Sequence, residues 1–257
     1  MRRILILILI LLSLMAFAPS VYGGFWDSAL ETVRDVTGPK EAGKTVGKQD
    51  GLTDQEILTG LREALNLGVQ RAVERASASG GFMDNPVIHI PLPGYLQNVS
   101  GTLRGLGLGS QTDAFEQTMN QAAEKASGEA LPVLVQAIKD LTFEDVRRLW
   151  KGGDTAATDY FREKTWQPLS ERFRPIVHAT SQTVGVTQAY QSLVDHAAVR
   201  PLIADTDLDL DHYVTGKALD GLFTLLAEEE KKIRTDPVAR TTDILKKVFG
   251  GRRAAWH

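Results

Sequence analysis

The chain has 257 residues, of which 43% are hydrophobic and 24% charged, and its formal net charge at pH 7 is −3. This is ordinary globular composition, and the length favours one domain over two full cores. Without a basic excess nucleic acid is not an expected partner. Without cysteine the chain has no disulfide, no thiolate metal site and no cysteine nucleophile.

Residues 1–23 have the layout of a secretory signal peptide. Two arginines follow Met1, an apolar run of 15 residues extends from Ile4 to Ala18, and small residues lead to Gly23. The run is shorter than the ~20 residues that span a bilayer. We therefore expect cleavage after Gly23 or Ser20, a periplasmic location and no transmembrane segment in the mature chain. The alternative is an uncleaved segment that anchors the protein to the inner membrane.

Residues 24–50 are predicted to form a helix and a glycine-rich linker. The stretch "GPKEAGKT" within them matches the phosphate-loop pattern G-x-x-x-x-G-K-[ST]. A phosphate loop needs a buried strand before it and a helix after it. Here the preceding apolar residues are spaced as on one helix face, and Val46 to Gly51 has linker composition. We therefore expect no nucleotide cofactor. The motif residues, interpreted as a chance match, are Gly38, Gly43, Lys44 and Thr45.

Residues 51–250 are predicted to form one helical domain, and 251–257 a tail. Thr53 to Glu56 has the pattern of a helix capping box. Apolar residues then recur at helical spacing: they are Ile57, Leu61, Ala64, Leu65, Gly68, Ala72 and Ala76. Glycine weakens a helix by about 1 kcal/mol relative to alanine, so we interpret Gly60 and Gly68 as points where another helix approaches closely.

Prolines interrupt the helical pattern between Phe82 and Pro93. Three prolines in eight residues exclude a helix and disfavour a central strand. We expect an extended segment laid over the helices, and its anchoring side chains are expected to be Val87, Ile88, Ile90 and Leu92. The glycines that follow, in "GLGLGS", are interpreted as a helix stop with a cap at Ser110.

Apolar stripes at helical spacing continue to Phe249. Pro168 is expected to start a helix and Pro175 to kink it. Asp236 is expected to cap the last helix, with proline at its first position.

The last long helix ends in a run of charged residues. Glu228 and Lys232, and likewise Glu230 and Arg234, are four residues apart with the carboxylate first. Pairs in this orientation stabilise exposed helix surfaces, so we expect the run to form a solvated face.

Two polar clusters are candidate ligand sites. The first follows Gly152-Gly153, which leaves a helix N-terminus accessible, and comprises Asp154, Thr155, Asp159 and Tyr160. The second comprises Asp207, Asp209, Asp211 and His212. The alternative for each is helix capping, by Asp154 or Thr155 in the first and by Asp209 or Asp211 in the second.

Metal and catalytic signatures are missing from the sequence. The acidic run lacks the glycine and the final glutamate that a calcium EF-hand loop needs. Neither H-E-x-x-H nor G-x-S-x-G occurs. We therefore expect no metal, no cofactor and no catalytic residue.

Several segments carry a family resemblance: "GLTDQEILTGLREAL", "NPVIHIPLPGYL", "FEDVRRLWKGGDTAATDYFREKT" and "DPVARTTDILKKVFG" among them. They resemble a family of exported bacterial proteins, domain-of-unknown-function family 4197, from about Gly51 to Phe249. The resemblance implies a helical fold and export in Gram-negative bacteria. It implies no activity and no catalytic residue.

The expected fold is therefore all-α, a single-domain multi-helix bundle with a short proline-rich extended segment. Stripes of Leu, Ala, Val and Phe without a convergent catalytic set favour a non-catalytic binding or interaction protein of the cell envelope. Its partner would be an apolar ligand or an envelope protein. The alternatives are a periplasmic hydrolase with an unrecognised acidic site and a self-associating envelope scaffold.

Overall fold

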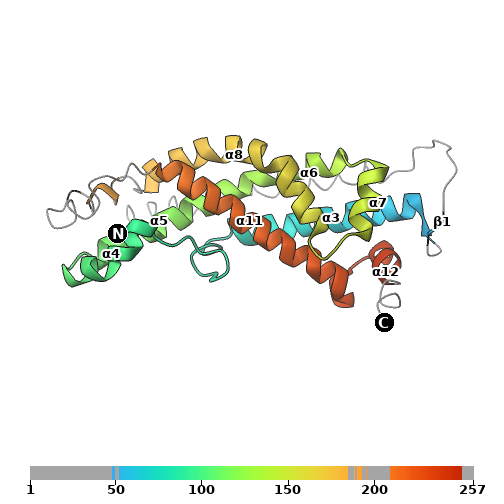
Figure 1. The fold of residues 1–257 in the computed structure, drawn as a ribbon, viewed down its shortest axis with the longest axis horizontal. Helices are drawn as coiled ribbons and strands as arrows, with labels where there is room; N and C mark the ends of the chain where they lie inside the picture. Colours follow the sequence, from blue (N-terminus) through green and yellow to red (C-terminus); the bar gives the residue numbers. More distant parts are fainter. Residues whose placement is uncertain are drawn as a thin grey trace, which may run out of the picture. The chain divides into compact units, whose positions relative to one another are not determined.

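The fold is all-α, as predicted. A computed structural model describes residues 48–49, 52–184, 188, 190–192, 195 and 209–250, so the signal-like segment, the phosphate-loop match and the tail lie outside the described residues. The described part contains eight α-helices (Figure 1). They are α3 (Asp54–Ser77), α4 (Gly94–Gly105), α5 (Gly109–Ser127), α6 (Leu131–Lys139), α7 (Phe143–Lys151), α8 (Ala156–Val184), α11 (Leu210–Thr235) and α12 (Asp243–Gly250).

Short elements complete the described chain. The strands β1 (Lys48–Gln49) and β2 (Leu52–Thr53) form a two-residue antiparallel ladder that leads into α3. The 3-10 turns η1 (Gly128–Ala130) and η2 (Pro237–Ala239) follow α5 and α11.

Helix α11 is the central element of the core. It packs against both α3 and α8, and α5 packs against α8 and α11 (Figure 1). The apolar stripe predicted on α3 is buried throughout. One of the apolar stripes expected between the strap and Phe249 lies on α11 and is buried as well: Val214, Ala218, Leu219, Leu222, Phe223, Leu225 and Leu226.

The N-terminus of α3 is fixed by the predicted capping box. The Glu56 N–H donates to Thr53 Oγ1 at 3.2 Å, and the Thr53 N–H donates to Glu56 Oε2 at 2.9 Å. Lys247 of α12 also donates to the other oxygen of Glu56. The Glu56 carboxylate therefore caps α3 and holds α12 against it.

Because of these contacts, the stability of the fold is expected to depend on pH in the acid range. The Lys247 ammonium, followed by the N–H and hydroxyl of Thr53, lowers the pKa of Glu56 from 4.5 to about 2. Because the pKa of Glu56 is lower in the folded protein than in the unfolded chain, its negative charge stabilises the fold at pH values above the unfolded pKa. This stabilisation is lost as the pH falls from about 4.5 to about 2 and the carboxylate becomes protonated. We expect Glu56→Gln and Lys247→Met each to flatten the pH dependence of urea unfolding in this window. Lys246→Met is the matched control, because Lys246 pairs with Asp243 instead; an equal flattening there would contradict the assignment.

Gly60 and Gly68 lie where α3 meets other helices, as predicted. A Cβ added at Gly60 would stand 2.6 Å from Val248 Cγ2 of α12. A Cβ at Gly68 would meet Glu229 and Leu226 of α11 at 3.8 Å, which is ordinary van der Waals contact. Gly60 is therefore required by packing, whereas Gly68 tolerates a methyl group.

The two glycines should respond oppositely to alanine. Gly60→Ala should destabilise the protein by about 1–2 kcal/mol, because overpacking against α12 outweighs the gain in helix propensity. Gly68→Ala should stabilise it by about 0.5–1 kcal/mol, since the propensity gain meets no clash. Urea unfolding of the two variants measures both free energies, and shifts of the same sign would refute this account of the packing.

The segment from Ala78 to Pro93, here called the strap, contains the predicted Phe82–Pro93 segment. It is non-helical and lies over the helices as predicted, but up to Ile88 it forms successive hydrogen-bonded turns rather than an extended chain. Two side chains of α5 bind its backbone. Asn120 accepts from the Ile90 N–H and donates to the Ile90 carbonyl, both at 2.9 Å, and Glu124 accepts from the Phe82 N–H at 3.2 Å. The strap thereby satisfies buried backbone groups without a sheet partner.

The side chains that anchor the strap differ from the prediction at one position. Ile88, Ile90 and Leu92 are buried, but Val87 is 60% exposed. The Val87 N–H donates to Asn85 Oδ1 at 3.1 Å, and this local turn directs the Val87 side chain away from the helices. Phe82 is the missed anchor: it is fully buried against Gly221 of α11.

The expected start of α5 was wrong. Ser110 lies inside α5 and donates to Gln111 Oε1 rather than capping the helix. The helix stop itself is confirmed, because Gly107 adopts φ +82°. The Leu108 N–H returns to the Leu103 carbonyl at 2.9 Å, and α5 then begins without a side-chain cap.

The predictions that Pro168 starts a helix and that Asp236 caps the last helix were also wrong. Pro168 starts no helix, because α8 runs unbroken through both Pro168 and Pro175. Both prolines are exposed, so water can hydrate the carbonyls that lose their helical N–H partner. Asp236 caps only the turn η2, and α12 begins at Asp243.

Candidate functional site

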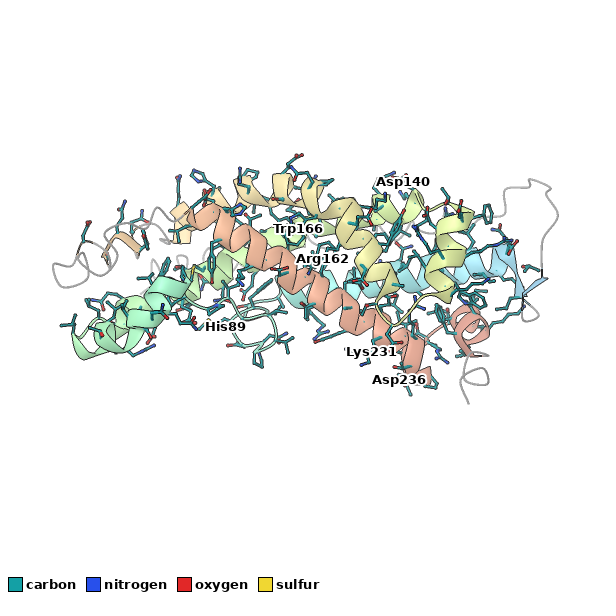
Figure 2. All side chains as sticks on the ribbon, viewed as in Figure 1. His89, Asp140, Arg162, Trp166, Lys231 and Asp236 are labelled. Carbon is teal, nitrogen blue, oxygen red and sulfur yellow. The ribbon has the colours of Figure 1, made fainter. Side chains whose placement is uncertain are left out.

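A charged groove lies where the first turns of α8 pass the second half of α11. Its volume is about 370 Å³, and Thr155 and Asp159 of the first predicted cluster line it. Arg162 of α8 and Phe223 and Lys231 of α11 also line it. Figure 2 labels Arg162 and Lys231 on these two helices. The groove therefore combines hydroxyl, carboxylate, cationic and aromatic groups in one place.

Arg162 is held in position at the groove. Its guanidinium carbon lies 5.1 Å from the ring centroids of both Trp166 and Phe223, which stack on each other. Its Nη1 also donates to Asp220 at 2.9 Å. Stacking and the ion pair together restrict the arginine before any ligand binds.

The remaining charges of the groove differ in how far they are already neutralised. Asp159 accepts from the Thr155 hydroxyl at 3.2 Å, and Glu228 is paired with Arg75 of α3 at 2.9 Å. The ammonium group of Lys231 has no ion-pair partner among the described residues. Lys231 is thus the groove cation most available to an incoming carboxylate.

A buried carboxylate behind the groove sets the position of α8. Glu230 of α11 is 7% exposed. It accepts from the N–H groups of Ala157 and Thr158 at 3.0 and 2.8 Å, and from the Thr158 hydroxyl at 2.8 Å. These amides lie in the first turn of α8, so Glu230 takes the place that Asp154 or Thr155 was expected to fill as a cap.

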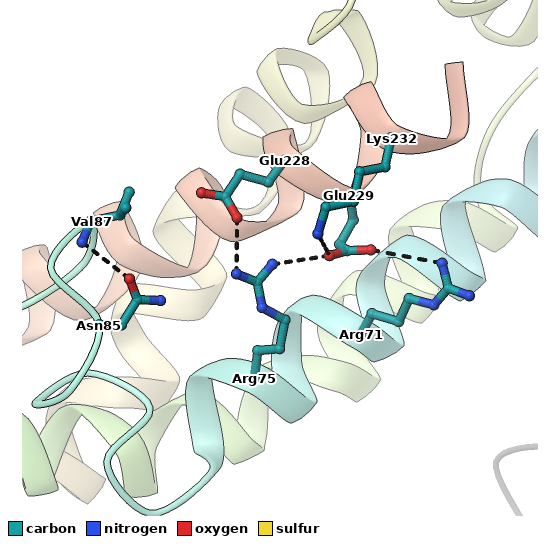
Figure 3. A network of polar contacts seen from close by, with 7 residues as sticks. All are labelled: Arg71, Arg75, Asn85, Val87, Glu228, Glu229 and Lys232. Atoms are coloured by element: carbon teal, nitrogen blue, oxygen red, sulfur yellow. Dashed lines mark hydrogen bonds and ion pairs between the residues drawn. The ribbon is translucent and has the colours of Figure 1, made fainter. Parts of the chain in front are cut away.

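The expectation of a solvated face at the end of α11 was therefore wrong. Glu230 and its predicted partner Arg234 do form an ion pair at 2.8 Å, but both side chains are buried. Glu229 is only 3% exposed and binds Arg75 of α3 at 3.0 Å and Lys232 at 2.8 Å, with Arg71 at 3.8 Å (Figure 3). Helical spacing predicted the Glu230–Arg234 pair, but the predicted Glu228–Lys232 pair is replaced by Lys232 with Glu229 and Arg75 with Glu228. The spacing also does not reveal which neighbouring helix covers these residues.

The buried Glu230–Arg234 pair leads to a prediction about the free energy of unfolding. Glu230→Gln keeps the shape of the side chain but leaves Arg234 buried without a counter-charge, and such a loss costs about 3 kcal/mol. Glu228→Gln is the matched control one position away. Because Glu228 is partly exposed, its loss should cost less than about 1 kcal/mol. Urea unfolding measures both, and equal costs would contradict the special role of Glu230.

The other members of the first cluster point elsewhere. Asp154 is exposed in the turn before α8. Tyr160 faces α7, where the guanidinium carbon of Arg148 lies 5.5 Å from its ring centroid. The pKa of its phenol is raised, mainly because the group is partly buried and next because Asp145 is negatively charged. The structure thus brings Thr155 and Asp159 together in the groove and leaves Asp154 and Tyr160 outside it.

The second cluster does not form one site within the described residues. Asp209 caps α11 by accepting from the His212 N–H at 2.9 Å, which confirms the capping alternative. Asp211 lies 2.6 Å from Nδ1 of His178 on α8, a pair that its separation in sequence concealed. His212 is exposed, and Asp207 lies outside the described residues. No group of three or more metal-ligating side chains occurs in the described ranges.

These features define a class of protein: an all-α domain whose long helices are joined by buried ion pairs beside a charged groove. None of the helices in the described part is long and apolar enough to cross a membrane. A family model described as a protein of unknown function (DUF4197) matches residues 51–250. The chain therefore belongs to this family, as the sequence resemblance implied. No curated protein and no solved structure matches it.

Proposed function

We propose that this chain is a non-catalytic binding protein of the cell envelope, and that it holds a protein partner in the groove between α8 and α11. The observation that carries the proposal is the charge pattern of the groove. Lys231, which has no ion-pair partner in the described part of the chain, and the preorganised Arg162 line the groove together with Asp159. Charges of both signs fix the register of a polypeptide and reject other partners. The signal-like residues 1–23 support the envelope location, with an uncleaved inner-membrane anchor as the alternative.

A protein partner agrees better with the structure than an apolar ligand. The partly open, mainly apolar cavity between α3, α8, α11 and α12 has a volume of about 20 Å³. This is far below the hundreds of Å³ that an organic ligand occupies. The groove is large enough, but charged side chains line it. An acyl chain would strip water from these charges without replacing it.

The hydrolase and scaffold alternatives make different predictions. Two carboxylates in the described part lie next to a histidine, Glu116 beside His89 at 2.9 Å and Asp211 beside His178 at 2.6 Å. For a hydrolase we take Asp211, because it belongs to a predicted acidic cluster and its partner His178 is 59% exposed. A substrate screen would then reveal turnover that Asp211→Asn abolishes. A scaffold would show mass that rises with concentration in purified protein.

The direct test is crosslinking from the groove. A photoreactive residue at Ala227 should trap one partner in intact cells, and mass spectrometry identifies it. Binding of the purified partner should weaken about tenfold in Lys231→Glu, equivalent to about 1.4 kcal/mol. Because Lys231 is exposed and forms no ion pair with any residue that the structure describes, this variant should fold normally.

Arg174→Glu provides the matched control. It makes the same charge change on an exposed residue of α8, three turns beyond Arg162 and outside the groove lining. The proposal fails if both variants bind equally, or if native mass spectrometry of the purified protein shows bound lipid and no partner is trapped.

A further inference from the structure

The charges along the groove between α8 and α11 follow a definite order. Glu230 of α11 bonds the first amides of α8, so its neighbour Lys231 lies level with the start of α8. Arg162 lies level with Phe223, because its guanidinium carbon is 5.1 Å from the centroid of that ring. Asp159 of α8 comes between these two levels and also lines the groove. The order along the groove is therefore cation, carboxylate, cation.

The groups that can still bind a charged partner have the same order. Lys231 forms no ion pair within the described part of the chain. Arg162 donates to Asp220 through Nη1, and its Nε and Nη2 have no hydrogen-bond partner among the described residues. Asp159 accepts from a hydroxyl and forms no ion pair there, whereas Glu228 is neutralised by an arginine of α3. Two cations and one carboxylate are thus available in the groove.

The spacing of these charges matches the turns of a helix. Phe223 and Lys231 are eight residues apart on α11, which corresponds to about 12 Å along the helix axis. Two turns of another helix cover about 11 Å. Side chains that project from three successive turns of one helix face can therefore meet Lys231, Asp159 and Arg162 in order.

The walls of the groove favour a helix over an extended peptide. An extended peptide that binds through its backbone needs an exposed sheet edge, but both walls are α-helices, in which the backbone groups bond to each other. A helical partner satisfies its own backbone and contributes side chains alone. Small side chains in the lining leave room for its approach: Thr155, Thr158, Thr224 and Ala227.

We infer that the partner in this groove is a helix of an envelope protein with a carboxylate, a basic side chain and a second carboxylate on successive turns of one face. The carboxylates bind Lys231 and Arg162, and the basic side chain binds Asp159. This inference rests on the proposed function and names the chemistry of the partner. A uniformly acidic helix is disfavoured because its middle carboxylate meets Asp159, and a uniformly basic helix because it meets both cations.

Crosslinking from Ala227, followed by sequencing of the crosslinked segment of the partner, tests this inference. A carbon-13-labelled synthetic peptide of that segment should show helical chemical shifts when it binds the protein as isolated from cells. Lys231→Glu should weaken its binding about tenfold. Exchanging the facing carboxylate of the peptide for lysine should restore most of this loss in the variant and should weaken binding to the wild-type protein.

Lys217→Glu is the matched control. It makes the same charge change on an exposed residue of α11 that lies outside the groove lining, so it should leave binding of the peptide unchanged. Equal weakening in Lys217→Glu and Lys231→Glu would show that net charge, rather than the groove, attracts the peptide, and would overturn the inference.

The outcomes separate this inference from the proposed function. If no partner is trapped, the proposed function fails and the inference fails with it. A trapped segment that binds in an extended form, or whose binding the charge exchange does not restore, contradicts the inference and leaves the proposed function intact. A crosslink to a second copy of this chain, or to another part of the same chain, also contradicts the inference.

Discussion

The carboxylate of Glu230 is the contact on which the arrangement of α8 depends. Taking a carboxylate out of water is expensive, and the cost is offset only when the group is fully bonded and paired. Glu230 accepts four hydrogen bonds, three from the start of α8 and one from Arg234. The positive end of the α8 dipole adds a further favourable interaction. The same contact fixes Thr155 and Asp159 beside α11. The groove between α8 and α11 therefore depends on the position that Glu230 gives to α8.

Other polar side chains on the helices also fix the packing of the core by binding buried partners. Consecutive residues project about 100° apart on a helix, so Glu229 faces α3 while Glu230 faces α8. Arg75 and Arg234 neutralise them. On α5, Asn120 and Glu124 bind the backbone of the strap in the same manner. Polar side chains on helices thus fix the packing that disulfides and sheets fix in other proteins.

The sequence predicted what depends on local spacing. The capping box at Thr53, the apolar stripes, the non-helical character of the strap and the close approach at Gly60 were all predicted, because each depends on residues a few positions apart. The burial of Glu229 and Glu230 was missed, since it depends on which helices cover α11. Thr155 and Asp159 were identified as polar candidates, but their groove partners Arg162 and Lys231 come from elsewhere along α8 and from α11. His178 and Asp211 could not be joined by any local rule.

Hydrogen exchange at the start of α8 tests the central role of Glu230 most directly. The first amides of a helix usually exchange fast because they have no intrahelical acceptor. If Glu230 binds the amides of Ala157 and Thr158, both should exchange as slowly as amides in the middle of α11. Fast exchange at these two amides, with α11 still protected, would show that the carboxylate does not hold α8 in place.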